Sequence, residues 1–329
     1  MPLPEPLTAL LGSPWPWPLL QAGALLLAWA LDRRFGEPPD RWHPVAWLGR
    51  LLGPIGRFWR DRAPVAAFAG GALSWLLIAA VLAGAAWALQ QQIITLPGPV
   101  ALGLLALALK PLFACRMLCD EVAAVEAALA QSLEAGRARL AWLVSRDVTR
   151  LDAGEVRESA IETLAENLND SVVAPLAWFA LAGLPGAVLY RFANTADAMW
   201  GYRGPWEWAG KWAARADDLL SWPTARVTAG LLRPAWRPQE WSRLAREAVL
   251  TPSPNGGWPM GAMALRLDVR LRKPGVYALH AAGRSPEAAD LGQALRLARS
   301  AARIWTGVLA GGLVAGALMM LTRLAGGPA

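Results

Sequence analysis

Long stretches without any charged residue alternate along this chain with stretches rich in arginine and acids. The uncharged stretches are Pro6–Leu31, Ala63–Leu109 and Ile304–Thr322. Because about 20 apolar residues suffice to cross a bilayer, the pattern predicts a polytopic integral membrane protein in which 1–329 forms a single membrane domain. The predicted spans cover about residues 15–31, 65–89, 98–118 and 304–323.

The segments between these spans differ in charge. Asp32–Arg62 holds seven arginines and four acids, whereas Gln90–Pro99 holds no charge. The positive-inside rule therefore places segments 32–62 and 119–302 in the cytoplasm, where we expect the chemistry. Within 119–302 only Val172–Tyr190 is apolar. Its prolines and glycines favour a buried or re-entrant hairpin over a further span.

The remaining periodicity is helical, and strand patterns are nearly absent. We predict helices at 119–145, 153–170, 187–201, 207–221, 239–250 and 286–303, and loops at 234–238 and 251–259, which are rich in Pro, Gly and Asn. The predicted fold class is all-α, with about four transmembrane helices and a helical cytoplasmic portion.

Composition changes this picture little. The formal net charge is +7, but the arginines accompany the membrane spans, so anchoring at anionic lipid explains them more simply than nucleic-acid binding. The two cysteines, Cys115 and Cys119, lie four residues apart near the end of the third predicted span. We interpret them as small apolar helix residues rather than metal ligands, and we predict no disulfide framework.

The segment Glu155–Asp170 has the most informative charge pattern. It carries five acids against one base, Arg157. The acids are Glu155, Glu158, Glu162, Glu166 and Asp170. On a helix they cover roughly a third of the circumference, and like charges four residues apart destabilise an isolated helix. We therefore expect a cation opposite this face, which could be a metal ion, a charged ligand or arginines from elsewhere. A solvated helix face is the structural alternative. Asp152 is expected to cap this helix in a capping box with Glu155.

Two later segments could supply partners for these acids. Asn194 and Asp197 lie three residues apart, so they share one helix face and could share an ion. Gly201 should end that helix, so Tyr202 and Arg203 should lie directly after its C-terminus.

Further on, Lys211 and Arg215 form a cationic pair at four-residue spacing that is suited to phosphate. A salt-bridge ladder between Lys211 and Asp218 is the alternative interpretation. The glycine spacing before Lys211 does not fit a phosphate-binding P-loop.

Two loops complete the candidates. In the first cytoplasmic segment Asp32 lies at the predicted membrane boundary, and His43 is one of only two histidines, a type of residue that is more often structural than catalytic when it stands alone. In the segment Ser253–Pro259, glycines would let backbone amides approach an anion closely.

Five segments, in this order, resemble the adenosylcobinamide-phosphate synthase family (CobD/CbiB) of cobalamin biosynthesis. They are LDRRFGEPP with HPV, SRDVTRLDAGEVRESAIETLAENLNDSVVAPL, NTADAMWGYR, GKWAARADDLLSWPTARVTA and SPNGGWPMGAMA. Together they extend from residue 31 to residue 264. The chain departs from the family pattern at Glu37, where the family usually has Asp, and at Ser221, where it usually has Asn.

The resemblance implies ATP-dependent formation of an amide between adenosylcobyric acid and (R)-1-amino-2-propanol or its O-phosphate, with ATP and Mg²⁺ as cofactors and the corrinoid as substrate. The implied Mg²⁺ ligands are Glu166, Asp170, Asn194, Asp197 and Asp217. The implied catalytic residues are Glu162, Glu166, Lys211 and Asp218, with Glu162 as general base because it is crowded by other acids. The implied ATP- and substrate-binding residues are Asp32, His43, Asn167, Tyr202, Arg203, Arg215, Asn255 and Trp258.

The resemblance also implies a multi-pass protein of the cytoplasmic (inner) membrane with its active site facing the cytoplasm. Besides the substrates and the lipid bilayer, the expected partners are other membrane enzymes of cobamide assembly and further copies of the chain, and no nucleic acid is expected. A non-catalytic membrane sensor like AmpE is the alternative function. It would not need Glu162, Glu166, Asp197, Lys211 and Asp218 together. A transporter is the third alternative, and the charge-free spans argue against it.

Overall fold

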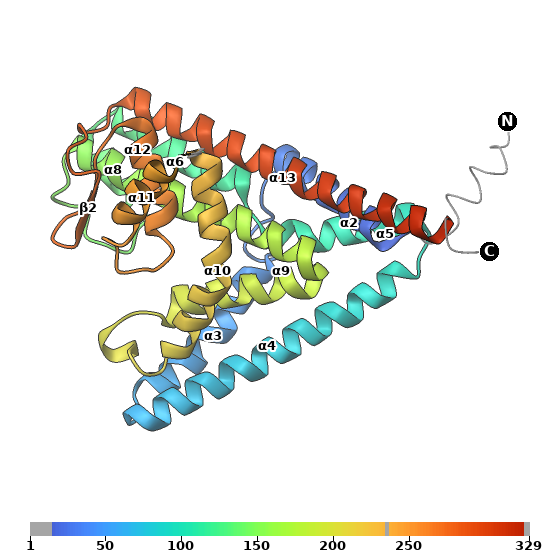
Figure 1. The fold of residues 1–329 in the computed structure, drawn as a ribbon. Helices are drawn as coiled ribbons and strands as arrows, with labels where there is room; N and C mark the ends of the chain where they lie inside the picture. Colours follow the sequence, from blue (N-terminus) through green and yellow to red (C-terminus); the bar gives the residue numbers. More distant parts are fainter. Residues whose placement is uncertain (1–14, 234–236, 326–329) are drawn as a thin grey trace. The chain divides into compact units, whose positions relative to one another are not determined.

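The computed structural model describes residues 15–233 and 237–325, and it is helical apart from one short hairpin (Figure 1). The helices are α2 (Trp17–Phe35), α3 (Pro44–Arg60), α4 (Pro64–Ile94), α5 (Gly98–Leu109), α6 (Cys115–Leu129), α7 (Leu133–Leu140), α8 (Ala153–Leu168), α9 (Ala174–Trp200), α10 (Lys211–Leu232), α11 (Pro238–Ala248), α12 (Gly257–Leu267) and α13 (Ala288–Ala325). Two antiparallel strands, β1 (Leu271–Lys273) and β2 (Tyr277–Leu279), form the hairpin. The predicted all-α class is confirmed.

Within residues 15–233 and 237–325, four helical stretches are long and apolar enough to cross a membrane. They are Pro64–Ile94, Gly98–Leu129, Ala153–Trp200 and Ala288–Met320. The first contains the predicted span 65–89, and the second contains the predicted span 98–118. Ala288–Met320 contains most of the predicted span 304–323. The predicted first span, 15–31, is helical in α2, but Asp32, Arg33 and Arg34 follow directly in this 19-residue helix. The remaining candidate span, Ala153–Trp200, contains the acidic helix α8 and the apolar helix α9. The chain is thus an all-α polytopic membrane protein.

The described chain divides into two compact units. Among the described residues, unit 1 draws on 15–114, 175–217 and 306–325, and unit 2 draws on 115–174, 218–233 and 237–305. Helices α9, α10 and α13 each contribute residues to both units. Each unit is described below by itself.

In unit 1 the apolar segment predicted as a hairpin contains a sharp kink. Gly183 in α9 has φ 67° and ψ −155°, which is not helical. A Cβ added at Gly186 would lie 2.4 Å from the carbonyl oxygen of Trp178, so the two helical halves pack directly against each other. Two buried glutamines satisfy the backbone groups that the kink frees. The Nε2 of Gln21 donates to the carbonyl of Phe179 (2.8 Å), and the Oε1 of Gln90 accepts from the backbone N–H of Leu184 (2.8 Å).

In unit 2 the acidic helix α8 packs against α6, α7, α12 and β1. Its predicted capping box is confirmed, because Asp152 accepts from the Glu155 backbone N–H (2.8 Å) and Glu155 accepts from that of Asp152 (2.9 Å). A π-helical segment, η2 (Asn169–Val173), continues α8 towards α9.

Several predicted boundaries were wrong, each for a local reason. The helix predicted at 119–145 is broken into α6 and α7, because Ser132 caps a new helix by accepting from the Ala135 backbone N–H. The loop predicted at 251–259 ends at Gly257, where α12 begins. The charged segment 32–62 contains the 17-residue helix α3, which starts with Pro44. The strands of the hairpin were not predicted, since each has only three residues.

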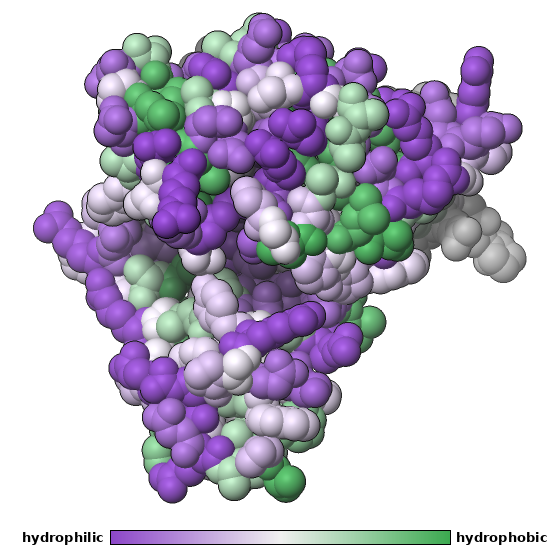
Figure 2. All heavy atoms as spheres, turned by 90° about the vertical axis from the view of Figure 1, so that its left-hand side faces the viewer, coloured by the Kyte–Doolittle hydropathy of each residue, from purple (hydrophilic) through white to green (hydrophobic). Residues whose placement is uncertain are grey.

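The loop predicted at 234–238 lies partly outside the described residues. Figure 2 looks onto the left-hand side of Figure 1, and it shows hydrophilic and hydrophobic residues interspersed there.

Candidate functional site

The cations opposite the acidic face of α8 are arginines from elsewhere in unit 2. Arg272 pairs with Glu155 (2.8 Å), and Arg270 pairs with Glu158 (3.2 Å). The side chain of Glu158 is fully buried against these two arginines of the β1 segment, so this part of the face is not the solvated helix face of the structural alternative. The outer part of the acidic face is therefore structural, and it attaches the hairpin to α8.

One turn further on, Glu162 lies in a buried ion pair that is only half satisfied. Its Oε2 accepts from Nη2 of Arg146 at 2.8 Å, and the two side chains are 5% and 17% exposed. The other carboxylate oxygen, Oε1, and the other terminal nitrogen, Nη1 of Arg146, are both buried and have no partner at hydrogen-bond distance among the described residues, although the Tyr277 phenol lies close enough to act on Glu162. Buried polar atoms are almost always paired in folded proteins. This pair therefore offers one acceptor and one donor to a ligand.

Tyr277 of β2 borders the same place. Burial raises the pKa of Tyr277, and the negative charges of Glu162 and Glu166 raise it further. The phenol therefore stays protonated at neutral pH and remains a hydrogen-bond donor beside these two carboxylates.

Glu166 lies one turn beyond Glu162, against the start of α12. A Cβ added at Gly256 would lie 2.8 Å from Oε1 of Glu166, so a larger residue there would shift the carboxylate from its present position. The N-terminus of a helix favours a negative charge. Gly256 precedes the first residue of α12, so the carboxylate of Glu166 lies at the favourable end of the helix dipole.

Asp170 lies within η2, where the wider turn changes the direction of the following side chains. Its Oδ1 accepts from Nδ2 of Asn169 (2.8 Å), and Oδ1 of Asn169 accepts from the Thr228 hydroxyl (3.2 Å). Asn167 instead donates to the carbonyl of Thr163 in its own helix (3.0 Å). Single π-helical turns inside α-helices occur frequently at functional sites.

The loop before α12 is held by an arginine that the sequence analysis did not single out. Arg226 lies over the rings of Trp222 and Trp258 (4.5 and 4.7 Å) and donates to Oδ1 of Asn255 (2.7 Å). Asn255 in turn donates from Nδ2 to the backbone carbonyl of Asp218 (2.7 Å). The predicted substrate residues Asn255 and Trp258 thus belong to one ordered network at the start of α12.

In unit 1, Asn194 and Asp217 lie next to each other although 23 residues separate them. Nδ2 of Asn194 is 3.5 Å from Oδ1 of Asp217, and Oδ1 of Asn194 is 3.4 Å from Nη1 of Arg191. Gly201 ends α9 as predicted, and a Cβ there would lie 1.9 Å from Oδ1 of Asp197.

The start of α10 is fixed by a close backbone contact. A Cβ added at Gly210 would lie 1.7 Å from the carbonyl oxygen of Trp200. The next residue, Lys211, lies over the ring of Trp208 at 4.5 Å and 3.7 Å from Glu207, with 40% of its side chain exposed. An exposed lysine can reach phosphate as a point charge. Tyr202 is exposed, as is Arg203 in the same turn, and Arg215 follows Lys211 one turn along α10.

The charged segment that follows α2 forms a compact charge cluster in unit 1. Nζ of Lys110 is 3.1 Å from Asp32 and 2.5 Å from Glu37. His43 caps α3, because its Nδ1 accepts from the Val45 backbone N–H, and its Nε2 lies 2.9 Å from Glu37. Both ring nitrogens are therefore engaged within the protein.

Glu37 is the centre of this cluster. Burial alone would raise the pKa of Glu37, but hydrogen bonds from His43 and Lys110 and their positive charges outweigh burial and hold the pKa below its ordinary value. The side chain of Glu37 reaches both partners. Glu37 and Lys110 also line a cavity of about 450 Å³ whose other walls are apolar, including Phe35 and Trp42.

The predicted Mg²⁺ ligands are divided between the units. Glu166 and Asp170 belong to unit 2, and Asn194, Asp197 and Asp217 belong to unit 1. In the described ranges, no group of three or more His, Cys, Asp or Glu side chains is arranged to hold a metal ion. Mg²⁺ is commonly held by only one or two carboxylates together with substrate phosphates, and the oxygen donors of Glu166 and Asp170 fit that mode.

Comparison with known proteins identifies the family. The profile described as CobD/Cbib protein matches residues 25–322. The chain belongs to the CobD/CbiB family. A probable cobalamin biosynthesis protein CobD of Thermococcus kodakarensis is 42% identical over 275 residues, which cover 83% of this chain and 89% of that protein. The cobalamin biosynthesis protein CobD of Chromobacterium violaceum is 38% identical over 316 residues, covering 89% of this chain and 97% of that one. No solved structure matches.

Membership of the CobD/CbiB family confirms the resemblance that the motifs predicted, and it assigns the chain to cobalamin biosynthesis rather than to the sensor-like alternative. The structure adds functional candidates that the sequence analysis missed, namely Arg146, Tyr277, Arg226 and Lys110. Arg146 stood inside a quoted motif and Lys110 was one of only three lysines, but nothing in the sequence indicated their partners.

Proposed function

We propose that this CobD/CbiB family member is an ATP-dependent ligase that joins adenosylcobyric acid to (R)-1-amino-2-propanol or its O-phosphate through an amide bond. The observation that carries the proposal is the family match over residues 25–322, taken together with the half-satisfied Arg146–Glu162 pair inside the matched region.

The reaction makes two chemical demands. A carboxylate is a poor electrophile, so one of its oxygens first attacks the γ-phosphorus of ATP, which forms an acyl phosphate and releases ADP. The amine nitrogen then attacks the acyl carbon, the C–N bond forms, and inorganic phosphate leaves with the former carboxylate oxygen. The ammonium form of the amine must lose one proton before its nitrogen can attack. The same nitrogen must lose a second proton to become the amide nitrogen, so a general base is needed.

The Arg146–Glu162 pair has the polarity of an amino-alcohol site. The unpartnered Oε1 of Glu162 can accept a hydrogen bond from the ammonium group, and the unpartnered Nη1 of Arg146 can donate to a hydroxyl or phosphate oxygen. The positive charge of Lys273 also acts on Glu162. Glu162 is therefore our candidate for the general base, and Arg146 is our candidate for the group that orients the amine.

When Mg²⁺ is bound, it neutralises charge on the ATP phosphates. Glu166 and Asp170 would hold it in unit 2, since both offer hard oxygen ligands. In unit 1, Asn194, Asp197 and Asp217 stay predicted ligands of the ion. Lys211, Arg203 and Arg215 stay predicted ligands of the phosphates, and Asp218 stays a predicted catalytic residue.

The test incubates the purified protein with adenosylcobyric acid, Mg-ATP and each amine in turn, and follows the corrinoid by mass spectrometry. We expect a product heavier by the amine minus one water, together with ADP. Glu162→Gln and Arg146→Met should each abolish turnover while the exposed control Glu134→Gln keeps the wild-type rate. An unchanged corrinoid with both amines would exclude the proposed reaction. Near-normal rates for both variants would show that the amine does not bind at the Arg146–Glu162 pair.

A further inference from the structure

The exposed face of α3 has the composition of a helix that lies at a membrane surface. Trp47, Leu51, Pro54 and Phe58 are all exposed and follow one another at four-, three- and four-residue spacing, which places them in one stripe. Two exposed arginines, Arg50 and Arg57, lie along one side of this stripe. A helix with an apolar stripe that contains tryptophan, bordered by basic residues, is typical of the bilayer interface.

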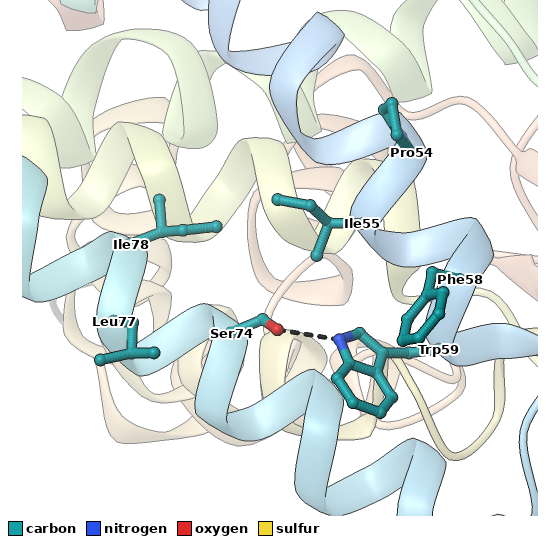
Figure 3. Close-up of a pocket in the computed structure, with 7 residues that line it drawn as sticks. All are labelled: Pro54, Ile55, Phe58, Trp59, Ser74, Leu77 and Ile78. Atoms are coloured by element: carbon teal, nitrogen blue, oxygen red, sulfur yellow. Dashed lines mark hydrogen bonds between the residues drawn. The ribbon is translucent and has the colours of Figure 1, made fainter.

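Beside this stripe, α3 and α4 enclose a groove of about 520 Å³ that is open on one side and almost entirely apolar. Figure 3 shows its walls, which are Pro54, Ile55, Phe58 and Trp59 of α3 and Ser74, Leu77 and Ile78 of α4. The groove thus joins the apolar stripe of α3 to a candidate membrane span.

The floor of the groove is held in place by specific contacts. Nε1 of Trp59 donates to the hydroxyl of Ser74 (2.9 Å), as the dashed line in Figure 3 marks. The indole lies directly on Gly70, where an added Cβ would be 2.3 Å from the ring. The Phe58 ring stands edge-on to the Trp59 ring at 4.9 Å. The only polar side chain in the wall, that of Ser74, is therefore satisfied within the protein.

A cation lies at one end of the groove. The guanidinium of Arg62 is 4.4 Å from the centre of the Phe58 ring, and the residue is exposed. In the described part of the chain Arg62 forms no ion pair with an acid, whereas its neighbour Arg60 is paired with Asp61 at 2.9 Å. An anion placed at this end of the groove would find Arg62 available.

We propose that this groove binds one acyl chain of an anionic glycerophospholipid, whose phosphate lies at Arg62. The apolar wall matches the chain and the guanidinium matches the phosphate. The setting also favours lipid as the occupant. Only 28% of the most apolar window of α4 is buried within the protein, so lipid must cover the rest. A soluble peptide would have to displace that lipid.

The test uses the purified full-length chain in detergent and native mass spectrometry, with titrations of phosphatidylglycerol and of phosphatidylcholine that carries the same acyl chains. The variants are Arg62→Gln, which removes the cation, and Ile78→Trp, which fills the groove. Their matched controls are Arg50→Gln on the exposed face of α3 and Leu76→Trp, an exposed position of α4 outside the groove. Phe58→Ala is a second groove variant, which replaces Ile78→Trp if that protein elutes as an aggregate.

We expect the wild-type chain to take up one phosphatidylglycerol more tightly than phosphatidylcholine. Arg62→Gln should weaken that event about fivefold, since one basic residue near an anionic lipid is worth about 1 kcal/mol. Ile78→Trp or Phe58→Ala should weaken it as well, while both controls bind as the wild type does. Equal binding of the two lipids, equal losses in Arg62→Gln and Arg50→Gln, or a tight event that persists in both groove variants would overturn the proposal.

Discussion

The kink in α9 gives a sharp test of the fold, because a single methyl group should disturb it in two ways. Gly183 has φ 67° and ψ −155°, a conformation that costs a residue with a side chain roughly 1–3 kcal/mol. The Cβ of Gly183→Ala would also lie 2.2 Å from Oε1 of Gln90. That oxygen must then move away from the backbone N–H of Leu184, which it now accepts from at 2.8 Å. Leaving a buried donor unpaired costs about 1–3 kcal/mol more.

Together these effects predict that Gly183→Ala lowers the free energy of unfolding by about 2–6 kcal/mol. The measurement is unfolding in mixed micelles with increasing SDS, followed by tryptophan fluorescence. Gly84→Ala is the matched control, since a Cβ at Gly84 in α4 meets nothing within 4 Å and alanine is the better helix former. Gln90→Ala removes only the cap, so it should lose less than Gly183→Ala. If Gly183→Ala unfolds at the wild-type SDS fraction, the kink does not have the described backbone, and the reasoning fails.

Three further outcomes are expected. Glu158→Gln should lower the free energy of unfolding by about 1–3 kcal/mol in the same titration, because it weakens the charged hydrogen bonds that the fully buried carboxylate makes with Arg270 and Arg272, and an unchanged midpoint would contradict these ion pairs. The pKa of Glu37 is held below its ordinary value of 4.5, so its contribution to stability is complete above that value and is lost as the pH falls through the lowered pKa. The difference in unfolding midpoint between wild type and Glu37→Gln should therefore be largest at pH 7 and shrink in acid, and a difference that grows in acid would refute this sign. Removal of Mg²⁺ by EDTA should abolish amide formation and added Mg²⁺ should restore it, whereas full activity in EDTA would exclude the proposed ion.

Much of the fold follows from local sequence, and the structure shows where local reasoning ends. The uncharged runs predict α4 and α5, and the Asp152–Glu155 capping box marks the start of α8 to the residue. Helix α3 was missed because seven arginines and four acids in the segment 32–62 hide its amphipathic stripe from a search for charge-free runs.

The candidate site was harder to predict, because its counter-ions come from distant parts of the chain. The acids of α8 predicted a cation opposite them, but Arg270 and Arg272 lie more than 110 residues further on, at a three-residue strand. Arg146 is only 16 residues from Glu162, yet the segment between them is irregular at its start and gives no periodicity that would bring the two together. Which acids are structural and which face a ligand is decided by these contacts, and the spacing of the acids alone does not contain them.

The most direct test of the proposed ligase uses adenosylcobyric acid that carries ¹⁸O in the reacting carboxylate. With Mg-ATP and the amine, the account predicts an amide product that has lost one labelled oxygen, and one labelled oxygen in the inorganic phosphate released, because that oxygen attacks the γ-phosphate. Glu162→Gln should yield neither product. An amide that forms without label in the phosphate, or no amide at all, would contradict the account.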